Sequence, residues 1–411
     1  MAIRAVAALL SCFATMTIVI AETWPQWRGP TRDGHVRQAS PWPDDLSKLK
    51  QTWRVELGPS YSGPIVAEDR VFVTESVDRD TEKVRALDRE TGRELWSVEW
   101  RASLSVPFFA KKSGDWIRAT PAYDGQSLFV ASMQDTLICL DAVTGAQRWR
   151  VDFPDKFQTS QPAFGFVPSP LVDQDAVYTF AGQSFVKLDK SSGNIIWRTL
   201  EQPAEDMEQS GAFSSPIMGD IDGRRQVLVQ TRTTLCGVAP ESGEVLWRQV
   251  VPAFRGCNIL TPTVFQNAVL TSTYQNKTFL YQISAGASGY EAREKWSNSK
   301  VKGYMSSPVI IDDYAFLHQG NGRFCCIDLR DGLETWRSEK FGEYWSLITN
   351  QGKILALDER GELLLIAADP KEFKLLDRRK VSEDDAWAHL AVADREVFVR
   401  ERRALAAYSW K

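Results

Sequence analysis

Short apolar runs with alternating polar positions recur along the chain from about residue 60 onward. In a typical unit an apolar stretch at residues 64–67 meets a polar turn at Glu68 and Asp69, and an alternating run follows over residues 70–74. Runs of about four to eight residues with a period of two are typical of half-buried β-strands. The pattern therefore predicts an all-β protein.

Five segments share a turn motif in which a glycine precedes a tryptophan by four residues. They are residues 87–96, 140–149, 188–197, 238–247 and 327–336, and most read Leu-Asp-x-x-Thr/Ser-Gly-x-x-x-Trp. The motif predicts a hairpin, because Asp accepts turn N–H groups and Gly supplies a positive φ. The tryptophan falls at the same place on each return strand, so we predict that it packs against the neighbouring unit rather than forming a ligand platform.

A second motif, Ser/Thr-Pro or a close variant, opens the next unit about twenty residues after each tryptophan. It occurs at residues 62–64, 119–121, 168–170, 214–216, 260–262 and 306–308. Each unit then holds four short strands, A to D from first to last, in about 45 to 50 residues, which matches a propeller blade. Counting opening strands gives eight blades, which begin near residues 62, 119, 168, 214, 260, 306, 346 and 389.

The eighth unit supplies only three strands and lacks the tryptophan strand, whereas residues 51–56 resemble a tryptophan strand with no unit before it. We therefore expect residues 50–57 to complete the eighth blade, which removes an open sheet edge. The predicted fold is all-β: a single eight-bladed β-propeller of four-stranded antiparallel blades over residues 50–411, closed by an N-terminal strand. Two blades are irregular, since the fifth has an expanded C–D turn and the seventh lacks the glycine turn and the tryptophan.

The first 21 residues have the pattern of a secretory signal peptide. One arginine precedes an apolar run over residues 5–20, and Ala21 offers a small residue for cleavage. A retained anchor, or a lipoprotein signal with acylated Cys12, are the alternatives. Cleavage would leave an N-terminal arm at residues 22–49 and no transmembrane segment, and export would place the chain in the periplasm or cell envelope.

Charge and cysteine content exclude some partners. The 49 Lys and Arg against 53 Asp and Glu give a net charge of −4 with no basic stripe, so nucleic acid is not expected as a partner. Five cysteines remain after signal cleavage, an odd number that cannot form a fully paired disulfide framework. The three histidines lack metal-ligand spacing, so no metal site is expected. We expect a monomer.

The repeat, seen most plainly at residues 86–96, resembles that of the pyrroloquinoline-quinone-like (PQQ-like) propeller family over roughly residues 50–411. That family includes the PQQ-dependent dehydrogenases and BamB, a non-enzymatic lipoprotein that supports assembly of outer-membrane β-barrels. In the dehydrogenases a vicinal disulfide stacks on the quinone beside calcium, which makes Cys325 and Cys326 candidate cofactor-binding residues. Their predicted place on strand C favours core packing instead. We expect no catalytic residue and no cofactor, with PQQ and calcium only if the chain is a quinoprotein.

Loops that lead into strand A, and loops between strands B and C, converge at the mouth of a propeller channel. Here the loops into strand A carry large side chains, among them Phe164 and Tyr344, and the longest loop, residues 101–115, is a candidate lid or contact arm. We predict that ten residues bind a protein partner in the envelope: Tyr61, Trp116, Arg118, Phe166, Phe213, Arg255, Tyr304, Trp345, Trp387 and His389. Sealing of the channel mouth is the structural alternative.

The function hypothesis that follows is a non-enzymatic, exported interaction scaffold similar to BamB, acting in outer-membrane protein assembly or a related envelope process. The first alternative is a PQQ-dependent quinoprotein oxidoreductase or a quinone-binding sensor. The second is polysaccharide or peptide binding through the aromatic rim. Because the fold alone does not determine function, the resemblance leaves all three open.

Overall fold

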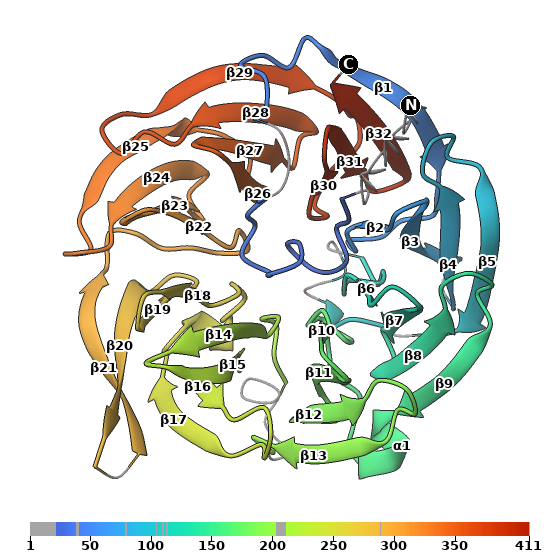
Figure 1. The fold of residues 1–411 in the computed structure, drawn as a ribbon, viewed down its shortest axis with the longest axis horizontal. Coiled ribbons are helices and arrows are strands. Elements are labelled where there is room, and N and C mark those ends of the chain that lie inside the picture. Colours follow the sequence, from blue (N-terminus) through green and yellow to red (C-terminus); the bar gives the residue numbers. More distant parts are fainter. Residues whose placement is uncertain are drawn as a thin grey trace, which may run out of the picture.

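The computed structural model describes residues 22–37, 41–78, 80–103, 105–108, 111, 114–202, 211–287 and 289–410. Within these residues the strands form eight four-stranded antiparallel sheets, arranged around a central axis as a closed ring (Figure 1). This confirms the predicted eight-bladed propeller. The predicted signal peptide, residues 1–21, lies outside the described residues.

Each blade consists of four consecutive strands, except the last. Blade 1 consists of β2 (Ile65–Val66), β3 (Arg70–Val77), β4 (Thr81–Asp88) and β5 (Glu94–Arg101). Blade 2 consists of β6 (Ala122–Tyr123), β7 (Ser127–Ser132), β8 (Thr136–Asp141) and β9 (Gln147–Asp152). Blade 3 consists of β10 (Leu171–Asp173), β11 (Ala176–Ala181), β12 (Ser184–Asp189) and β13 (Ile195–Thr199), and blade 4 of β14 (Ile217–Ile221), β15 (Arg224–Gln230), β16 (Thr234–Val238) and β17 (Val245–Val250). Blade 5 is β18 (Thr263–Phe265), β19 (Ala268–Ser272), β20 (Thr278–Gly286) and β21 (Gly289–Asn298); blade 6 is β22 (Val309–Ile311), β23 (Tyr314–His318), β24 (Arg323–Asp328) and β25 (Glu334–Lys340); blade 7 is β26 (Trp345–Asn350), β27 (Lys353–Asp358), β28 (Glu362–Ala367) and β29 (Lys374–Lys380).

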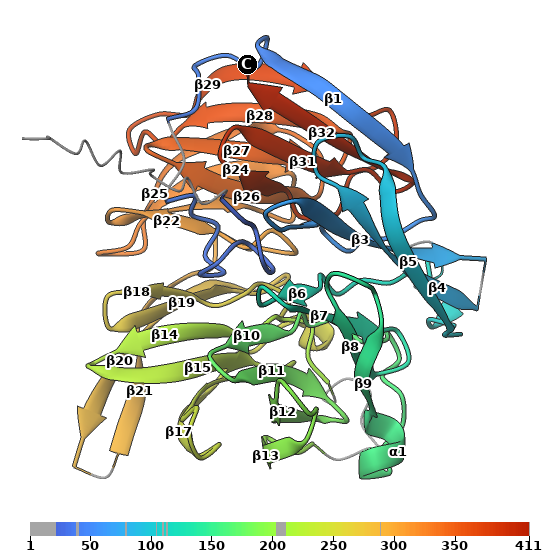
Figure 2. The same cartoon turned by 45° about the vertical axis from the view of Figure 1, so that its right-hand side comes forward.

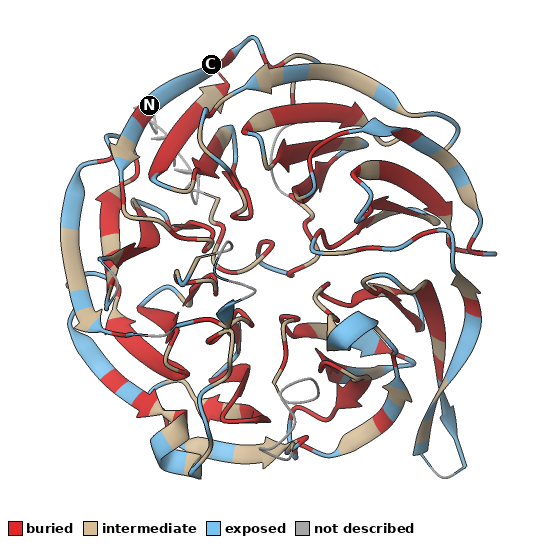
Figure 3. Ribbon diagram, turned by 180° about the vertical axis from the view of Figure 1, so that it is seen from behind, coloured by how far each residue is buried: buried red, intermediate tan, exposed pale blue. Residues whose placement is uncertain are grey.

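Blade 8 closes the ring as the sequence predicts. It contains β30 (Ala391–Ala393), β31 (Glu396–Arg400) and β32 (Ala404–Trp410), and its fourth strand is β1 (Leu49–Glu56), which pairs antiparallel with β32. The middle strands of the blades are buried, whereas the outer strands are made up mostly of exposed and half-buried residues (Figure 3). Two short helical segments, α1 (Phe153–Phe157) and η2 (Phe254–Gly256), lie in the loops that lead into blades 3 and 5.

A β-bulge positions every repeat tryptophan. In each case the register between strands C and D shifts by one residue directly before the tryptophan. In blade 1, for example, Leu87 pairs with Glu94 and Ala86 pairs with Trp96, so Leu95 has no partner in the register. A bulge re-aims the side chain that follows it. The same slip precedes Trp53, Trp96, Trp149, Trp197, Trp247, Trp296 and Trp336.

Six of these tryptophans join one blade to the next through the following blade's C–D turn. The indole N–H donates to a backbone carbonyl oxygen there, at 2.8 Å for Trp53 to Arg89 and 2.9 Å for Trp149 to Lys190. The remaining pairs are Trp96 to Ala142, Trp197 to Pro240, Trp296 to Leu329 and Trp336 to Asp369. This confirms that the tryptophans connect neighbouring repeats.

The turn glycine has two roles in this contact between the tryptophan of one blade and the C–D turn of the next, which we call the joint. Gly193 has a φ of 71°, a conformation that side-chain-bearing residues rarely adopt. A Cβ atom there would also lie 2.8 Å from the ring of Trp149, and the corresponding distance at Gly145 to Trp96 is 2.7 Å. The glycine therefore allows both the turn and the close approach of the indole.

Two junctions depart from this rule. Blade 5 has a long β20–β21 hairpin in place of the tight turn, which extends outward from the ring (Figure 2), and Trp247 donates instead to Gln226 of its own blade. In blade 7 the position after the bulge is Asp377, whose carboxylate accepts the N–H of Leu46 at 2.6 Å. Arm residues therefore cover the junction between blades 7 and 8, where Trp42 stacks on Trp410.

We predict that Trp149→Ala lowers the free energy of unfolding by about 3 kcal/mol, because it removes a large buried ring and leaves a void. Gly193→Ala should also destabilise, through the clash with the same ring. The measurement is the midpoint of chemical denaturation, with Val143→Ala as a control, since Val143 is 66% exposed on a C–D turn. A Gly193→Ala variant as stable as the original protein would contradict this account of the joint.

Candidate functional site: an aromatic arc on one face

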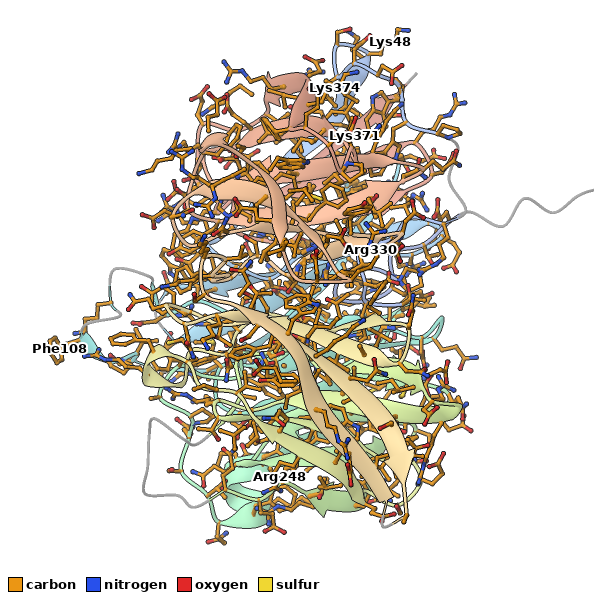
Figure 4. The ribbon with its side chains drawn as sticks, turned by 90° about the vertical axis from the view of Figure 1, so that its left-hand side faces the viewer. Lys48, Phe108, Arg248, Arg330, Lys371 and Lys374 are labelled. Carbon is orange, nitrogen blue, oxygen red and sulfur yellow. The ribbon has the colours of Figure 1, made fainter. Side chains whose placement is uncertain are left out.

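The loops that lead into strand A and the B–C loops lie on the same face of the ring, because strands alternate in direction around each blade. We call this the rim face; the A–B and C–D turns form the opposite face. The longest loop, between β5 and β6, includes Phe108, which is 84% exposed and projects away from the ring (Figure 4).

Seven aromatic side chains on the rim face follow one another across blades 5, 6, 7, 8, 1 and 2. We call them the aromatic arc: Phe254, Tyr274, Tyr304, Tyr344, Trp387, Tyr61 and Trp116. Successive ring centroids lie 6.1, 4.2, 5.6, 4.3, 4.9 and 5.3 Å apart. Phe254 is exposed and the other six are half-buried, so the rings support one another while part of each remains accessible.

Arginines lie over both ends of the aromatic arc. Arg118 is 5.4 Å from the ring centroid of Tyr61, Arg402 is 5.8 Å from that of Trp116, and Arg255 is 5.3 Å from that of Phe254. A guanidinium in this position is attracted by the ring electrons. Burial raises the pKa of Tyr61 to about 12, so its phenol stays neutral at physiological pH. The arc therefore combines apolar area with polar groups at its ends.

Most of the predicted partner-binding residues lie in or beside this surface. Tyr61, Trp116, Tyr304 and Trp387 belong to the aromatic arc, and Arg118 and Arg255 lie over its rings. Phe213 lies in the loop into blade 4, where it meets Phe164 at a centroid distance of 5.4 Å.

Three predicted contact residues are buried instead. Phe166 is 1% exposed and packs on Phe153. Trp345 is 4% exposed and stacks on His318, and His389 is 7% exposed. A partner would not reach these side chains in this structure, so their positions correct the sequence prediction: they support the interior of the ring. Apolar residues in loops have no periodicity that separates inward from outward positions.

Sequence reasoning did not identify Phe254, Tyr274 or Arg402. Tyr274 and Arg402 lie in B–C loops, which the sequence analysis placed at the channel mouth without naming residues in them. The position of these two residues in the repeat could have identified them. An aromatic residue or an arginine in a B–C loop lies beside the loop that leads into the neighbouring strand A.

The N-terminal arm runs through the centre of the ring, where Figure 1 shows it as the dark blue segment. Trp24 pairs with Val66 of blade 1, and the N–H of Val36 donates to Thr349 of blade 7 at 2.8 Å. Between them the indole of Trp27 donates to Thr261 of blade 5 at 3.0 Å. The sequence predicted an arm at residues 22–49 but not its position inside the ring.

Two fully buried arginines fix the arm within the channel. Arg28 donates to the carbonyl oxygen of Pro308 at 2.5 Å, and Arg32 donates to those of Ser169 and Pro170 at 2.9 and 2.7 Å. Burial lowers the pKa of Arg28 to about 10 and that of Arg32 to about 9, so both remain protonated at neutral pH. The arm thus connects blades on opposite sides of the ring.

A cavity of about 280 Å³ lies elsewhere on the rim face, where the loops of blades 2, 3 and 4 meet. Asp135 of the β7–β8 loop reaches its inner wall and is 1% exposed. One carboxylate oxygen accepts the N–H of Gly182 at 2.8 Å, and the other has no hydrogen-bond partner. Burial, with Asp152 as a further negative charge, raises the pKa of Asp135 to about 7.

The two cysteines that were candidates for contact with a quinone are not placed to stack on one. Cys325 and Cys326 are both fully buried on β24, and they belong to different hydrophobic clusters, one between blades 5 and 6 and one between blades 6 and 7. Burial raises the pKa of the Cys326 thiol to about 12. Among the described residues, no group of three or more His, Cys, Asp or Glu side chains is placed to hold a metal ion.

Comparison with known proteins places this architecture in a family. The sequence profile of the family described as outer membrane protein assembly factor BamB matches residues 45–104 and 80–338. The chain belongs to this family. Its propeller is a PQQ-like repeat propeller, as the turn motif indicates.

Three similar proteins show how far the likeness extends. The outer membrane protein assembly factor BamB of Yersinia pestis is 23% identical over 264 residues, which covers 61% of this chain and 63% of that protein. The crystal structure of BamB from Moraxella catarrhalis superposes with a TM-score of 0.62 at 14% identity, over 88% of this chain and 99% of that one. A quinohemoprotein alcohol dehydrogenase from Comamonas testosteroni superposes with a TM-score of 0.58 at 13% identity, over 96% and 81%, which shows a shared fold.

The part of the chain that the structure describes contains no helix long and apolar enough to cross a membrane.

We predict that the contribution of Asp135 to the stability of the protein falls as the pH rises from about 4 to about 7. Its folded-state pKa lies above the ordinary value of 3.8, so the native state holds a proton that the unfolded chain has already lost, and folding becomes less favourable over that range. Asp135→Asn keeps an acceptor for Gly182 and removes this titration. Denaturation midpoints are measured for both proteins at several pH values. The midpoint of the variant relative to that of the original protein should rise toward pH 8. A difference between the two midpoints that stays constant with pH would contradict the assignment.

Proposed function

We propose that this chain is a non-enzymatic scaffold of the cell envelope that contributes to outer-membrane protein assembly by binding a protein partner through the aromatic arc. The observation that carries the proposal is the arc itself: seven aromatic side chains in contact across six blades, partly exposed, with arginines over its ends. Tryptophan, tyrosine and arginine are the residues that carry most binding energy at protein interfaces.

The position of the aromatic arc favours a macromolecular partner. Its rings extend along the rim, from η2 to the loop into blade 2, rather than around a single deep pocket. Each ring is held by its neighbours, so a partner would lose little side-chain entropy in ordering them. The channel, where a small ligand would be enclosed, is occupied by Trp27 and Arg28 of the arm.

The family supports the envelope part of the proposal. Its relatives are named as factors in outer-membrane protein assembly, and residues 1–21 have the pattern of an export signal. Together these support the proposal that the chain acts in the periplasm or at the envelope, with a membrane-assembly protein as the partner.

We predict that Tyr274→Ala combined with Trp387→Ala reduces the recovery of the partner at least tenfold, because two central contacts of the arc are removed. The partner is recovered by reversible crosslinking in the envelope, purification and mass spectrometry. Leu333→Ala is the matched control, since Leu333 is an apolar residue, 63% exposed, on a C–D turn of the opposite face. Circular dichroism and the denaturation midpoint establish that each variant is folded.

Equal recovery from the arc variant and the control would contradict the proposal, as would normal outer-membrane protein assembly in cells that lack the chain.

The quinoprotein alternative has its own test. Titration of the purified protein with PQQ and calcium should leave no bound chromophore; stoichiometric binding with alcohol-dependent dye reduction would replace the scaffold by an oxidoreductase.

A further inference from the structure

A second cavity on the rim face, of about 550 Å³, lies where the B–C loop of blade 5, the loop into blade 6 and the B–C loop of blade 6 meet. We call it the basic groove. The described residues that line it include Lys300, Lys302 and Arg337 but no aspartate or glutamate. Both lysines are exposed, so a partner can reach their ammonium groups.

The charge available in the basic groove comes from the two lysines. Arg337 already pairs with Glu334 at 2.6 Å, on the outer strand β25. Across the part of the chain that the structure describes, neither Lys300 nor Lys302 forms an ion pair. Two cations therefore lie close together on the rim face with no negative charge paired to them.

Hydrogen bonds between the loops fix the floor of the basic groove. The buried Gln319 accepts the N–H of Lys302 on its side-chain oxygen at 3.4 Å, and the N–H of Gly320 donates to the carbonyl oxygen of Lys302 at 3.0 Å. The N–H of Gly303 donates to the hydroxyl of Ser272 at 2.7 Å, and a Cβ atom at Gly303 would lie only 2.9 Å from that hydroxyl. The backbone of Lys302 is thus held in place while its side chain stays accessible.

The basic groove adjoins the aromatic arc. Tyr274 lines the groove and also belongs to the arc, where its ring centroid lies 4.2 Å from that of Tyr304. Gly320 lies against both tyrosines, because a Cβ atom there would be 3.3 Å from Tyr304 and 4.0 Å from Tyr274. A ligand in the groove would therefore contact cations and an aromatic ring together.

The rest of the lining favours a peptide over a highly charged polyanion. Gln275, Ser299 and Asn321 line the groove and are exposed, and their amide and hydroxyl groups can donate to carboxylate or peptide carbonyl oxygens. The chain as a whole carries a net charge of −4, which gives no long-range attraction to an anionic membrane or to nucleic acid. Two local cations beside an aromatic ring match one or two carboxylates on a protein segment.

We propose that the basic groove binds an acidic segment of a protein partner, with its carboxylates on the ammonium groups of Lys300 and Lys302 and a neighbouring aromatic or apolar side chain on Tyr274. The proposal rests on the proposed function, because it names the chemistry of a partner segment that the aromatic arc would contact. Complementary charge across an interface contributes more to specificity and association rate than to affinity. The groove would thus select among partners that the rings alone bind alike.

The test begins with the purified protein, immobilised and exposed to a displayed library of random dodecapeptides. We expect the selected peptides to be enriched in acidic residues next to aromatic ones. Selection with the double variant Lys300→Gln, Lys302→Gln should lose the acidic enrichment and keep the aromatic enrichment. The matched control is Lys371→Gln with Lys374→Gln, which removes the same charge from two exposed lysines at the C–D turn of blade 7, on the opposite face (Figure 4).

A selected peptide is then compared, by fluorescence anisotropy, with a copy in which glutamine replaces each glutamate and asparagine each aspartate. The acidic peptide should bind about fivefold more tightly, in keeping with the modest strength of exposed ion pairs. This preference should shrink as sodium chloride is raised from about 50 mM to about 500 mM, because salt screens exposed charges. It should vanish in the double variant at positions 300 and 302 and persist in the control.

Equal affinity of the two peptides, a preference that survives in the double variant at positions 300 and 302, or a selection without acidic enrichment would overturn the proposal. Vesicles of phosphatidylcholine with and without phosphatidylglycerol test a membrane instead. Binding to the phosphatidylglycerol vesicles that this double variant loses, without any peptide preference, would also overturn it. Failure of the groove leaves the aromatic enrichment intact, whereas failure of the aromatic arc removes that enrichment, so the two failures are distinct.

Discussion

The docking of a tryptophan from one blade onto the glycine turn of the next is the contact on which the ring depends. It needs three things together: a bulge that aims the indole, a carbonyl oxygen that accepts its N–H, and a glycine whose missing Cβ leaves room for the ring. Trp149, Lys190 and Gly193 show all three. Because each joint involves only adjacent blades, its repetition builds a closed ring from one local rule.

The joints occupy the turns of one face, which leaves the loops of the rim face available for other contacts. The aromatic arc and the cavity at Asp135 both lie among those loops. The arm supports the ring from its centre, since Trp27, Arg28 and Arg32 contact the loops that lead into the inner strands of three blades. A rigid ring with a filled channel presents its loops as a fixed surface, which suits recognition of another protein.

The sequence predicted the parts of the structure that follow from local patterns. The Gly-to-Trp spacing identified the blades, and the unmatched strand at residues 51–56 identified the closure. It did not predict contacts between distant segments: Trp27 meets Thr261, 234 positions away, and Leu46 meets Asp377, 331 positions away. Among the loop residues predicted to bind a partner, some remain partly exposed, as Tyr61 does, whereas others turn inward, as Phe166 does. Burial in irregular loops depends on tertiary packing, which no short pattern encodes.

Site-specific photocrosslinking in living cells tests most directly whether the rim face is the binding surface. A photoreactive phenylalanine analogue would replace Tyr274 in one protein and Leu333, on the opposite face, in another. The account predicts that illumination joins the chain to an outer-membrane assembly protein from position 274 and not from position 333. Crosslinking from position 333 alone, or equally from both, would contradict it.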